Sequence, residues 1–371
     1  MAEQFTTLAS LTVDGKGSYG IGASAVPFSK DLYTYLRITD IKDDGTLNLQ
    51  DLKSVDDEKA SEYLLKPNDI VFARTGASTG RNYFYDGMDG EFVYAGFLIK
   101  FSIDEKKVNP KYIKYFCQSK QYKDWINSFN TGSTRGNINA QTLGKMPIPL
   151  IERTAQDALV SILSSIDEKI KKNNEINNNL EQQAQAIYQQ MFIENQNPNW
   201  KEGKLSDLVA VKYGKDHKKL DDGCYPVYGS GGIMRYVEKP LYTGESVLIP
   251  RKGTLNNVMY VNGAFWSVDT MFYTEMLRPN IAKFVYHFVK GKDLASLNAG
   301  SAVPSMTTNI LNAMPLYVPD DETLSIFEEM VTPMYSQMQE NEKQSANLAN
   351  IRDTLLPRLM SGELDVSDID L

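Results

Sequence analysis

Histidine and cysteine are scarce in this chain of 371 residues, which has two of each. Cys117 and Cys224 are far apart and have no paired neighbours, which argues against a disulfide framework and against a zinc site. With only His217 and His287 available, a histidine-rich metal site or a histidine-based proton relay is also disfavoured. The scarcity of both residues therefore predicts a protein without a bound metal.

Enzymatic motifs and membrane segments are missing as well. The sequence contains no GxxxxGK[ST] motif, which argues against an NTPase, and its glycine-rich stretch at 15–22 does not follow a strand and open a helix, as a nucleotide-binding loop must. No apolar run approaches the length of a membrane span, and the N-terminus lacks the basic and apolar regions of a signal peptide. We expect no cofactor, and we expect a cytoplasmic protein.

The net charge of −8 is unevenly distributed along the chain. Residues 151–195 carry a net charge of −3 and residues 321–371 a net charge of −8, whereas residues 1–150 are neutral and residues 196–320 carry +3. The distribution of charge decides whether a phosphate-binding surface can exist. The acidic total therefore does not exclude nucleic acid as a partner.

A long helix is predicted over residues 155–192. Apolar residues and two asparagines recur there in alternating steps of four and three, which is typical of a helix seam packed against another helix. Asparagines in such a seam lower its stability but fix its register. The seam positions are Leu159, Leu163, Ile166, Ile170, Asn173, Asn177, Leu180, Ala184, Ile187 and Met191.

The same pattern returns 168 residues later without a gap, which predicts an internal repeat. Two such helices running in opposite directions would bury both seams against each other. Pro333 and Pro357 lie inside the second helix, so we expect a bend or a helix end near each. The equivalent seam positions are Phe327, Val331, Met334, Met338, Asn341, Leu348, Leu355 and Leu359.

Each long helix follows a globular region that is predicted to mix strands and helices. In the first region we expect strands at 33–38, 69–74 and 92–101, and a helix over 110–125. In the second region we expect strands at 225–227, 246–249, 257–261 and 270–273, and a helix over 279–289.

Each globular region has a polar loop after a predicted strand, at 74–81 and at 251–254. Arginine forks, short hydroxyl side chains and glycine-freed backbone amides bond phosphate oxygens and base edges. Each loop alone is explained equally well as a solvated loop, but the matched pair favours contact with nucleic acid. A basic stretch at 212–219 adds to them. The candidate DNA-binding residues are Lys16, Tyr19, Arg37, Arg74, Thr75, Ser78, Thr79, Arg81, Arg135, Asn137, Lys212, Tyr213, Lys215, Lys218, Lys219, Arg235, Arg251, Lys252 and Thr254.

Taken in order, several stretches resemble the specificity (S) subunits of type I restriction–modification systems. The similarity spans nearly the whole chain. It departs from the family pattern at 250–253, where Pro-Arg-Lys-Gly replaces the Ala-Arg-Thr-Gly of the first region. The stretches that carry the resemblance are 17–27, 35–41, 69–76, 146–150, 162–170 and 352–364.

The resemblance implies a mixed α/β fold: two globular α/β target recognition domains separated by two long helices, which pack as an antiparallel coiled coil with a pseudo-two-fold internal repeat. We expect recognition domains at 1–152 and 196–320, and long spacer helices at 153–195 and, with a C-terminal tail, at 321–371.

The resemblance also implies a non-catalytic reader of double-stranded DNA. Each recognition domain would read one half of an asymmetric, bipartite site, and the helix pair would set the spacing between the halves. Two methyltransferase subunits would dock on the helices and domains, and restriction/translocase subunits would join that core.

A second interpretation is a coiled-coil adaptor whose globular regions bind proteins. It accounts for the helices and the acidity but not for the paired Arg/Thr/Gly loops. An enzyme ranks third, because the sequence offers no cofactor loop and no catalytic constellation.

Overall fold

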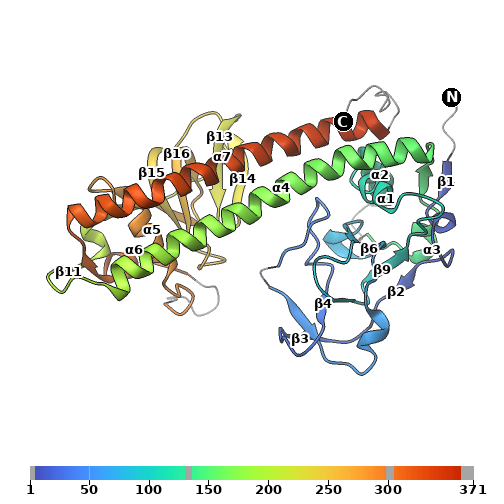
Figure 1. The fold of residues 1–371 in the computed structure, drawn as a ribbon, viewed down its shortest axis with the longest axis horizontal. Helices are drawn as coiled ribbons and strands as arrows, with labels where there is room; N and C mark the ends of the chain where they lie inside the picture. Colours follow the sequence, from blue (N-terminus) through green and yellow to red (C-terminus); the bar gives the residue numbers. More distant parts are fainter. Residues whose placement is uncertain (1–4, 50, 130–135, 298–304, 361–371) are drawn as a thin grey trace. The chain divides into compact units, whose positions relative to one another are not determined.

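The computed structural model describes residues 5–49, 51–129, 136–297 and 305–360. It divides into two compact units: residues 1–172 with 344–371 (unit 1), and residues 173–343 (unit 2). Two long helices, α4 (Arg153–Tyr188) and α7 (Asp321–Met360), each contribute to both units (Figure 1). The predicted order of globular region, long helix, globular region and long helix is confirmed.

Unit 1 contains two small sheets and a two-stranded ribbon. The first sheet is antiparallel and has the order β2 (Ser18–Tyr19), β9 (Leu98–Ser102), β6 (Asp69–Ala73), β7 (Asn82–Tyr85). The second has the order β3 (Ala25–Pro27), β5 (Lys53–Val55), β4 (Thr34–Leu36), β8 (Phe92–Tyr94). The ribbon pairs β1 (Phe5–Thr7) with β10 (Pro147–Pro149), and the short helices are α1 (Pro110–Phe116), α2 (Lys120–Asn127) and α3 (Ala140–Gly144).

Unit 2 contains one six-stranded sheet and a ribbon. The sheet order is β12 (Val209–Tyr213), β17 (Met271–Met276), β15 (Tyr242–Pro250), β16 (Met259–Ser267), β13 (Asp222–Gly229), β14 (Gly232–Val237). The ribbon pairs β11 (Lys201–Lys204) with β18 (Pro315–Val318), and the short helices are α5 (Ala282–Lys290) and α6 (Thr308–Asn312). At its C-terminal end α4 continues as a π-helix, Gln189–Glu194.

The two units share one topology, which confirms the internal repeat. The antiparallel pairs β2–β9, β9–β6 and β6–β7 correspond to β12–β17, β17–β15 and β15–β16. The parallel pair β4–β8 corresponds to β13–β16, and the antiparallel pair β4–β5 corresponds to β13–β14. The strands that form two separate sheets in unit 1 correspond to strands of a single sheet in unit 2. The sheet of unit 2 is continuous because β16 is long enough to pair with both β15 and β13.

The long helices pack antiparallel within each unit (Figure 1). In unit 1 the core joins Leu163 of α4 to Leu359 of α7, and in unit 2 it joins Tyr188 of α4 to Phe327 of α7. Nine seam side chains are buried: Leu159, Leu163, Ile166, Asn173, Ala184, Phe327, Val331, Asn341 and Leu359. The other seam side chains of the candidate set are half-buried: Ile170, Leu180, Ile187, Met334, Met338, Leu348 and Leu355.

Each globular region is fastened to the helices at equivalent positions. In unit 1, Asp167 of α4 accepts from the Lys114 ammonium at 2.8 Å and from the Tyr115 hydroxyl at 2.9 Å, both on α1, and from Arg352 of α7 at 3.0 Å. Burial by itself raises the pKa of Asp167, but these partners hold that pKa below its ordinary value. In unit 2 the position one repeat later, Tyr335, binds His287 of α5 at 2.9 Å.

Two local predictions are wrong, and a third is wrong in part. Of the bend or helix end expected near Pro333 and Pro357, the helix end does not occur: α7 continues through both prolines, since long-range packing outweighs the local cost of each. The strand predicted at 92–101 is two strands, β8 and β9, because Gly96 lies in a turn between them. The helix predicted over 110–125 is α1 and α2, since Ser119 caps a new helix by accepting from the Tyr122 N–H.

Within the residues that the structure describes, no helix is long and apolar enough to cross a membrane.

Candidate nucleic-acid interface

Arg74 follows β6 and is held between aromatic rings in unit 1. Its guanidinium carbon lies 5.2 Å from the ring centre of Tyr19 and 5.8 Å from that of Phe97, within the range of cation–π attraction. Its backbone N–H donates to the Phe97 carbonyl at 3.1 Å, and its carbonyl accepts from the Ile138 N–H at 2.9 Å. The Arg74 Nε is buried and has no hydrogen-bond partner among the described residues.

Arg251 occupies the same place in unit 2, directly after β15. Its guanidinium carbon lies 5.4 Å from the ring centre of Tyr213. Its backbone N–H donates to the Thr270 carbonyl at 2.8 Å, and its carbonyl accepts from the Met306 N–H at 2.9 Å. The guanidinium also donates to the Asp269 carbonyl at 3.2 Å. We call each stacked pair, Arg74 with Tyr19 and Arg251 with Tyr213, an arginine–tyrosine module.

A glycine follows the tyrosine in both modules, and the fold requires it. The Gly20 N–H donates to the Leu98 carbonyl at 3.2 Å, and the Gly214 N–H donates to the Met271 carbonyl at 3.0 Å. A Cβ on Gly20 would lie 2.2 Å from the Tyr94 carbonyl oxygen, and one on Gly214 would lie 2.0 Å from a carbonyl oxygen as well. The close approach fixes the tyrosine ring beneath the arginine.

Among the arginines of the candidate set that the structure describes, the two module arginines have no carboxylate partner. The described residues place no Asp or Glu oxygen within 4.0 Å of Arg74 or Arg251. By contrast, three other arginines of the candidate set are held in ion pairs: Arg37 with Asp40, Arg81 with Asp43 and Arg235 with Asp222, each at 2.7 Å. A guanidinium that is already paired with a carboxylate binds a phosphate less strongly, so the main role of these three arginines is to stabilise their own loops.

The hydroxyl side chains after Arg74 point largely into the protein. The Thr79 hydroxyl donates to the carbonyls of Gly76 and Gly136, and Ser78 is only 8% exposed. Thr75 forms an antiparallel bridge with Asn137, whose side chain is exposed. The structure thus brings Tyr19, Arg74, Thr75 and Asn137 of the candidate set together.

The loop after Arg74 also contains a Gly-x-Ser-x-Gly sequence at 76–80, the pattern of a hydrolase nucleophile elbow. Such an elbow joins a strand to a helix and exposes its serine to a histidine. Ser78 instead is buried in a short 3₁₀ turn between β6 and β7, and both histidines of the chain belong to unit 2. The loop is therefore not built as a nucleophile site.

Most of the candidate lysines are exposed. Lys212 lies 3.6 Å from Glu275, whereas the described residues provide no acidic partner for the others. Arg235 donates to the Leu220 carbonyl and therefore belongs with the 218–222 segment rather than with the module. Arg135 lies outside the described residues. The exposed candidates without an acidic partner are Lys16, Lys215, Lys218, Lys219 and Lys252, and Thr254 is exposed beside them in the sequence.

Sequence reasoning missed Phe97, which is 56% exposed and forms the second wall of the Arg74 site. Its equivalent in unit 2 is Thr270, because both carbonyls accept from the module arginine. The available signal was Gly96, which interrupts an otherwise apolar run and indicates a turn.

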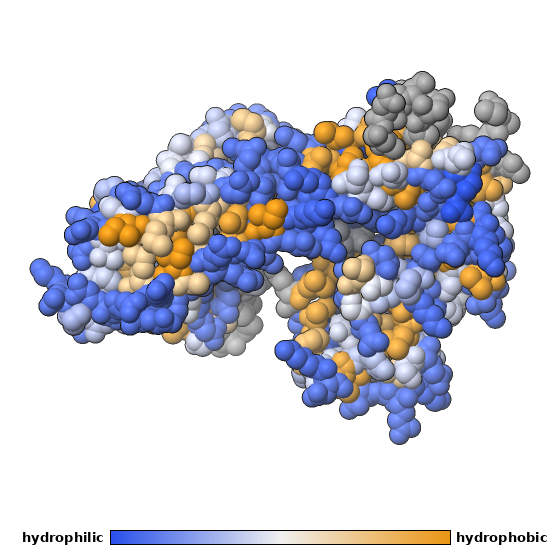
Figure 2. Space-filling view, viewed as in Figure 1, coloured by the Kyte–Doolittle hydropathy of each residue, from blue (hydrophilic) through white to orange (hydrophobic). Residues whose placement is uncertain are grey.

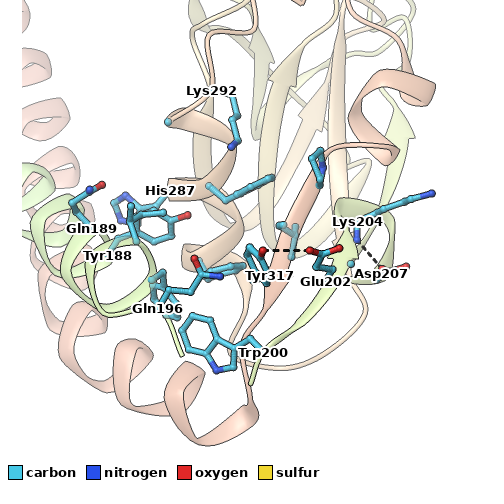
Figure 3. A pocket seen from close by; sticks show the side chains of 18 of the residues that line it. Tyr188, Gln189, Gln196, Trp200, Glu202, Lys204, Asp207, His287, Lys292 and Tyr317 are labelled. Atoms are coloured by element: carbon cyan, nitrogen blue, oxygen red, sulfur yellow. Dashed lines mark hydrogen bonds between the residues drawn. The ribbon is translucent and has the colours of Figure 1, made fainter. Parts of the chain in front are cut away.

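A cleft of about 950 Å³ lies in unit 2, at the C-terminal end of α4 (Figure 3). Figure 3 shows Tyr188, Trp200 and Tyr317 around it, with His287 at its inner side. Both nitrogens of His287 are engaged, one with Gln185 at 2.8 Å and one with the Tyr335 hydroxyl, and burial lowers its pKa to about 4. The histidine is therefore neutral, both of its nitrogens already have partners, and aromatic side chains line much of the cleft.

Comparisons with known proteins point to one family. A model described as the type I restriction modification DNA specificity domain matches residues 29–182 and, a second time, residues 197–346. The type I restriction enzyme MjaIX specificity subunit of Methanocaldococcus jannaschii is 20% identical over 310 residues, which are 72% of this chain and 72% of that protein. The HindI specificity subunit of Haemophilus influenzae is 24% identical over 180 residues, which are 48% of this chain but 34% of that protein.

A solved structure shares the fold. The crystal structure of the S subunit of a type I restriction–modification system from M. genitalium aligns with a TM-score of 0.56 and 20% identity, over 96% of each chain.

Proposed function

We propose that this chain, which belongs to the family of the type I restriction modification DNA specificity domain, gives a restriction–modification complex its DNA sequence specificity. It does so through its two arginine–tyrosine modules. Each unit then reads one half of a bipartite DNA site. The chain itself carries out no chemistry, and its partners modify or cut the DNA.

The observation that carries this proposal is the pair Arg74 and Arg251. They sit at equivalent places in two unlike globular regions, they are stacked on tyrosines, and neither faces a carboxylate among the described residues. Stacking holds each guanidinium in place without neutralising it, so that little conformational freedom is lost when an anion binds. DNA offers phosphate oxygens and guanine edges, and an arginine fork matches both.

The two halves of the site should differ in sequence. The modules share their arginine, tyrosine and glycine, but their neighbours are unlike: Thr75 and Phe97 in unit 1, Lys252 and Thr270 in unit 2. An asymmetric site follows from unlike neighbours, and the helix pair α4 and α7 sets the distance between the halves.

Methyltransferase and restriction subunits would complete the complex. Figure 2 shows apolar patches on the part of the surface that the long helices form. On α7, Ile326 and Met330 are each 47% exposed and lie one helical turn apart. Contiguous apolar surface on a helix favours a protein partner, so we place methyltransferase docking on the helices.

The protein-binding adaptor is not favoured, because it leaves the unpaired, tyrosine-stacked arginines without a role. The two interpretations separate in one experiment, hydroxyl-radical footprinting of the chain assembled with its methyltransferase. Two short protected blocks on either side of an unprotected gap are expected. A single block, or no sequence-dependent protection, would overturn the proposal.

A further inference from the structure

Phe97 is an exposed aromatic side chain that the turn around it does not require. It is 56% exposed, and it lies in the turn 95–97 that joins β8 to β9. In that turn the Leu98 N–H donates to the Ala95 carbonyl at 2.8 Å, a bond made by backbone atoms alone. The turn would therefore form with a smaller side chain at position 97.

Unit 2 shows that a different side chain is tolerated there. The equivalent turn, 268–270, is closed by the Met271 N–H donating to the Val268 carbonyl at 2.9 Å, and Thr270 stands where unit 1 has Phe97. Both positions give their carbonyl to the module arginine. The backbone hydrogen bonds of the turn are thus the same in the two units, whereas the side chain beside the arginine is an exposed phenylalanine in unit 1 and a half-buried threonine in unit 2.

This division between a common arginine and a variable neighbour matches the two components of DNA recognition. Phosphates are the same in every sequence, so an element shared by two unlike units suits the backbone. Base edges differ and lie deep in the groove, so they must be reached by side chains that protrude and that differ between the units. Arg74 is half-buried, whereas Phe97 is exposed.

We propose that Arg74 binds a DNA phosphate and that Phe97 reads a thymine by contact with its C5-methyl group, in the half-site bound by unit 1. The inference rests on the proposed DNA-reading function. Phenylalanine cannot hydrogen-bond a base edge, and the thymine methyl is the one apolar group that the major groove displays. In unit 2 the same place holds Thr270 with the exposed Lys252 nearby, so that half-site is read by other contacts.

The test uses the chain assembled with its methyltransferase. The bipartite site is first selected from a library of randomised duplexes, and the half bound by unit 1 is identified as the half whose footprint weakens in Arg74→Ala. Each thymine of that half is then replaced by uracil, which removes only the methyl group. At one thymine the replacement should weaken binding by the wild-type complex about five- to tenfold, within the effect of a single altered base pair.

Substitutions in the chain then show which side chain contacts the thymine methyl group. Phe97→Ala should bind the thymine and uracil duplexes equally, and Phe97→Leu should retain part of the preference. Arg74→Ala should weaken binding to both duplexes alike and reduce the salt slope by about one. Phe28→Ala, which removes another exposed aromatic of unit 1, is the matched control and should leave the preference intact.

Two results would overturn the inference. One is a wild-type complex that binds thymine and uracil equally throughout that half, and the other is a Phe97→Ala variant that keeps the preference. Failure of the proposed function itself looks different, because then the selection yields no bipartite site.

Discussion

Asn173 and Asn341, which are separated by one full repeat of 168 residues, meet in the seam between α4 and α7. The Asn173 side-chain amide donates to the backbone carbonyl of Asn341 at 3.4 Å. The Asn341 amide in turn donates to the Asn177 side-chain oxygen at 2.8 Å, and the Asn177 amide donates to the Met338 carbonyl at 3.1 Å. Equivalent residues thus lie opposite each other, and polar partners fix the register of the helices at this point.

This network predicts a non-additive pair of substitutions. Asn341→Ala should lower the free energy of unfolding by about 1–3 kcal/mol, because it removes the buried Asn341 amide and leaves the half-buried Asn177 side chain without its donor. Asn177→Leu combined with Asn341→Leu should recover much of that loss, since neither partner then needs a hydrogen bond. Urea denaturation measures both, with Asn174→Ala on the exposed face of α4 as control. A double variant as unstable as the sum of its single variants would contradict this role.

The glycine after each module tyrosine should be irreplaceable. Gly20→Ala places a methyl group against two backbone carbonyls, which should cost about 1–3 kcal/mol and shift Tyr19 from beneath Arg74. We expect weaker protection of one half-site in the footprint. Gly22→Ala is the matched control, since nothing lies within 4 Å of a Cβ there. Equal binding by the two alanine variants would show that the tyrosine position is unimportant.

His287 predicts how the stability of unit 2 depends on pH. Burial lowers its pKa to about 4, with Glu181 opposing the shift and Lys290 adding to it. The unfolded chain binds a proton below the ordinary pKa of about 6.5, whereas the folded chain does so only near pH 4. The contribution of the neutral His287 to the free energy of unfolding is therefore complete above pH 6.5. It decreases by about 1.4 kcal/mol for each pH unit as the pH falls from 6.5 to 4.

Replacement of the histidine should remove that slope. His287→Gln cannot be protonated, so thermal unfolding of this variant should vary less between pH 6.5 and 4 than that of the wild type. The ionic cluster around Asp167 loses its contribution only when the pH falls below that carboxyl's ordinary value, and it does not obscure the comparison. The same slope in both proteins would contradict the assignment.

The length of the helix pair should set the unread gap. Insertion of one heptad into α4 after Lys172 and one into α7 after Lys343 adds about 10 Å to each helix, or about three base pairs of DNA. It also preserves the seam pattern apart from a rotation of about 20°. Site selection with the lengthened chain should return the same half-sites with a longer gap. An unchanged gap would refute the role of the helices as a spacer.

The long helices and the repeat could be predicted because their pattern is regular and local in sequence. The modules could not, since Tyr19 and Arg74 come from different strands and meet only after the sheet forms. Arg37, Arg81 and Arg235 looked equivalent to Arg74 in the sequence, and only the structure distinguishes them by their carboxylate partners. Pro333 misled because its local cost is visible in the sequence, whereas the packing that outweighs it is not.

The most direct measurement compares the footprints of Arg74→Ala and Arg251→Ala, each assembled with the methyltransferase. Both arginines are free of carboxylate partners in the described residues, so either substitution should leave the fold and the assembly intact. We expect each variant to lose protection in a different block of the site and to keep the other. Loss of both blocks in each variant, or of neither, would contradict the account of two units that read DNA separately.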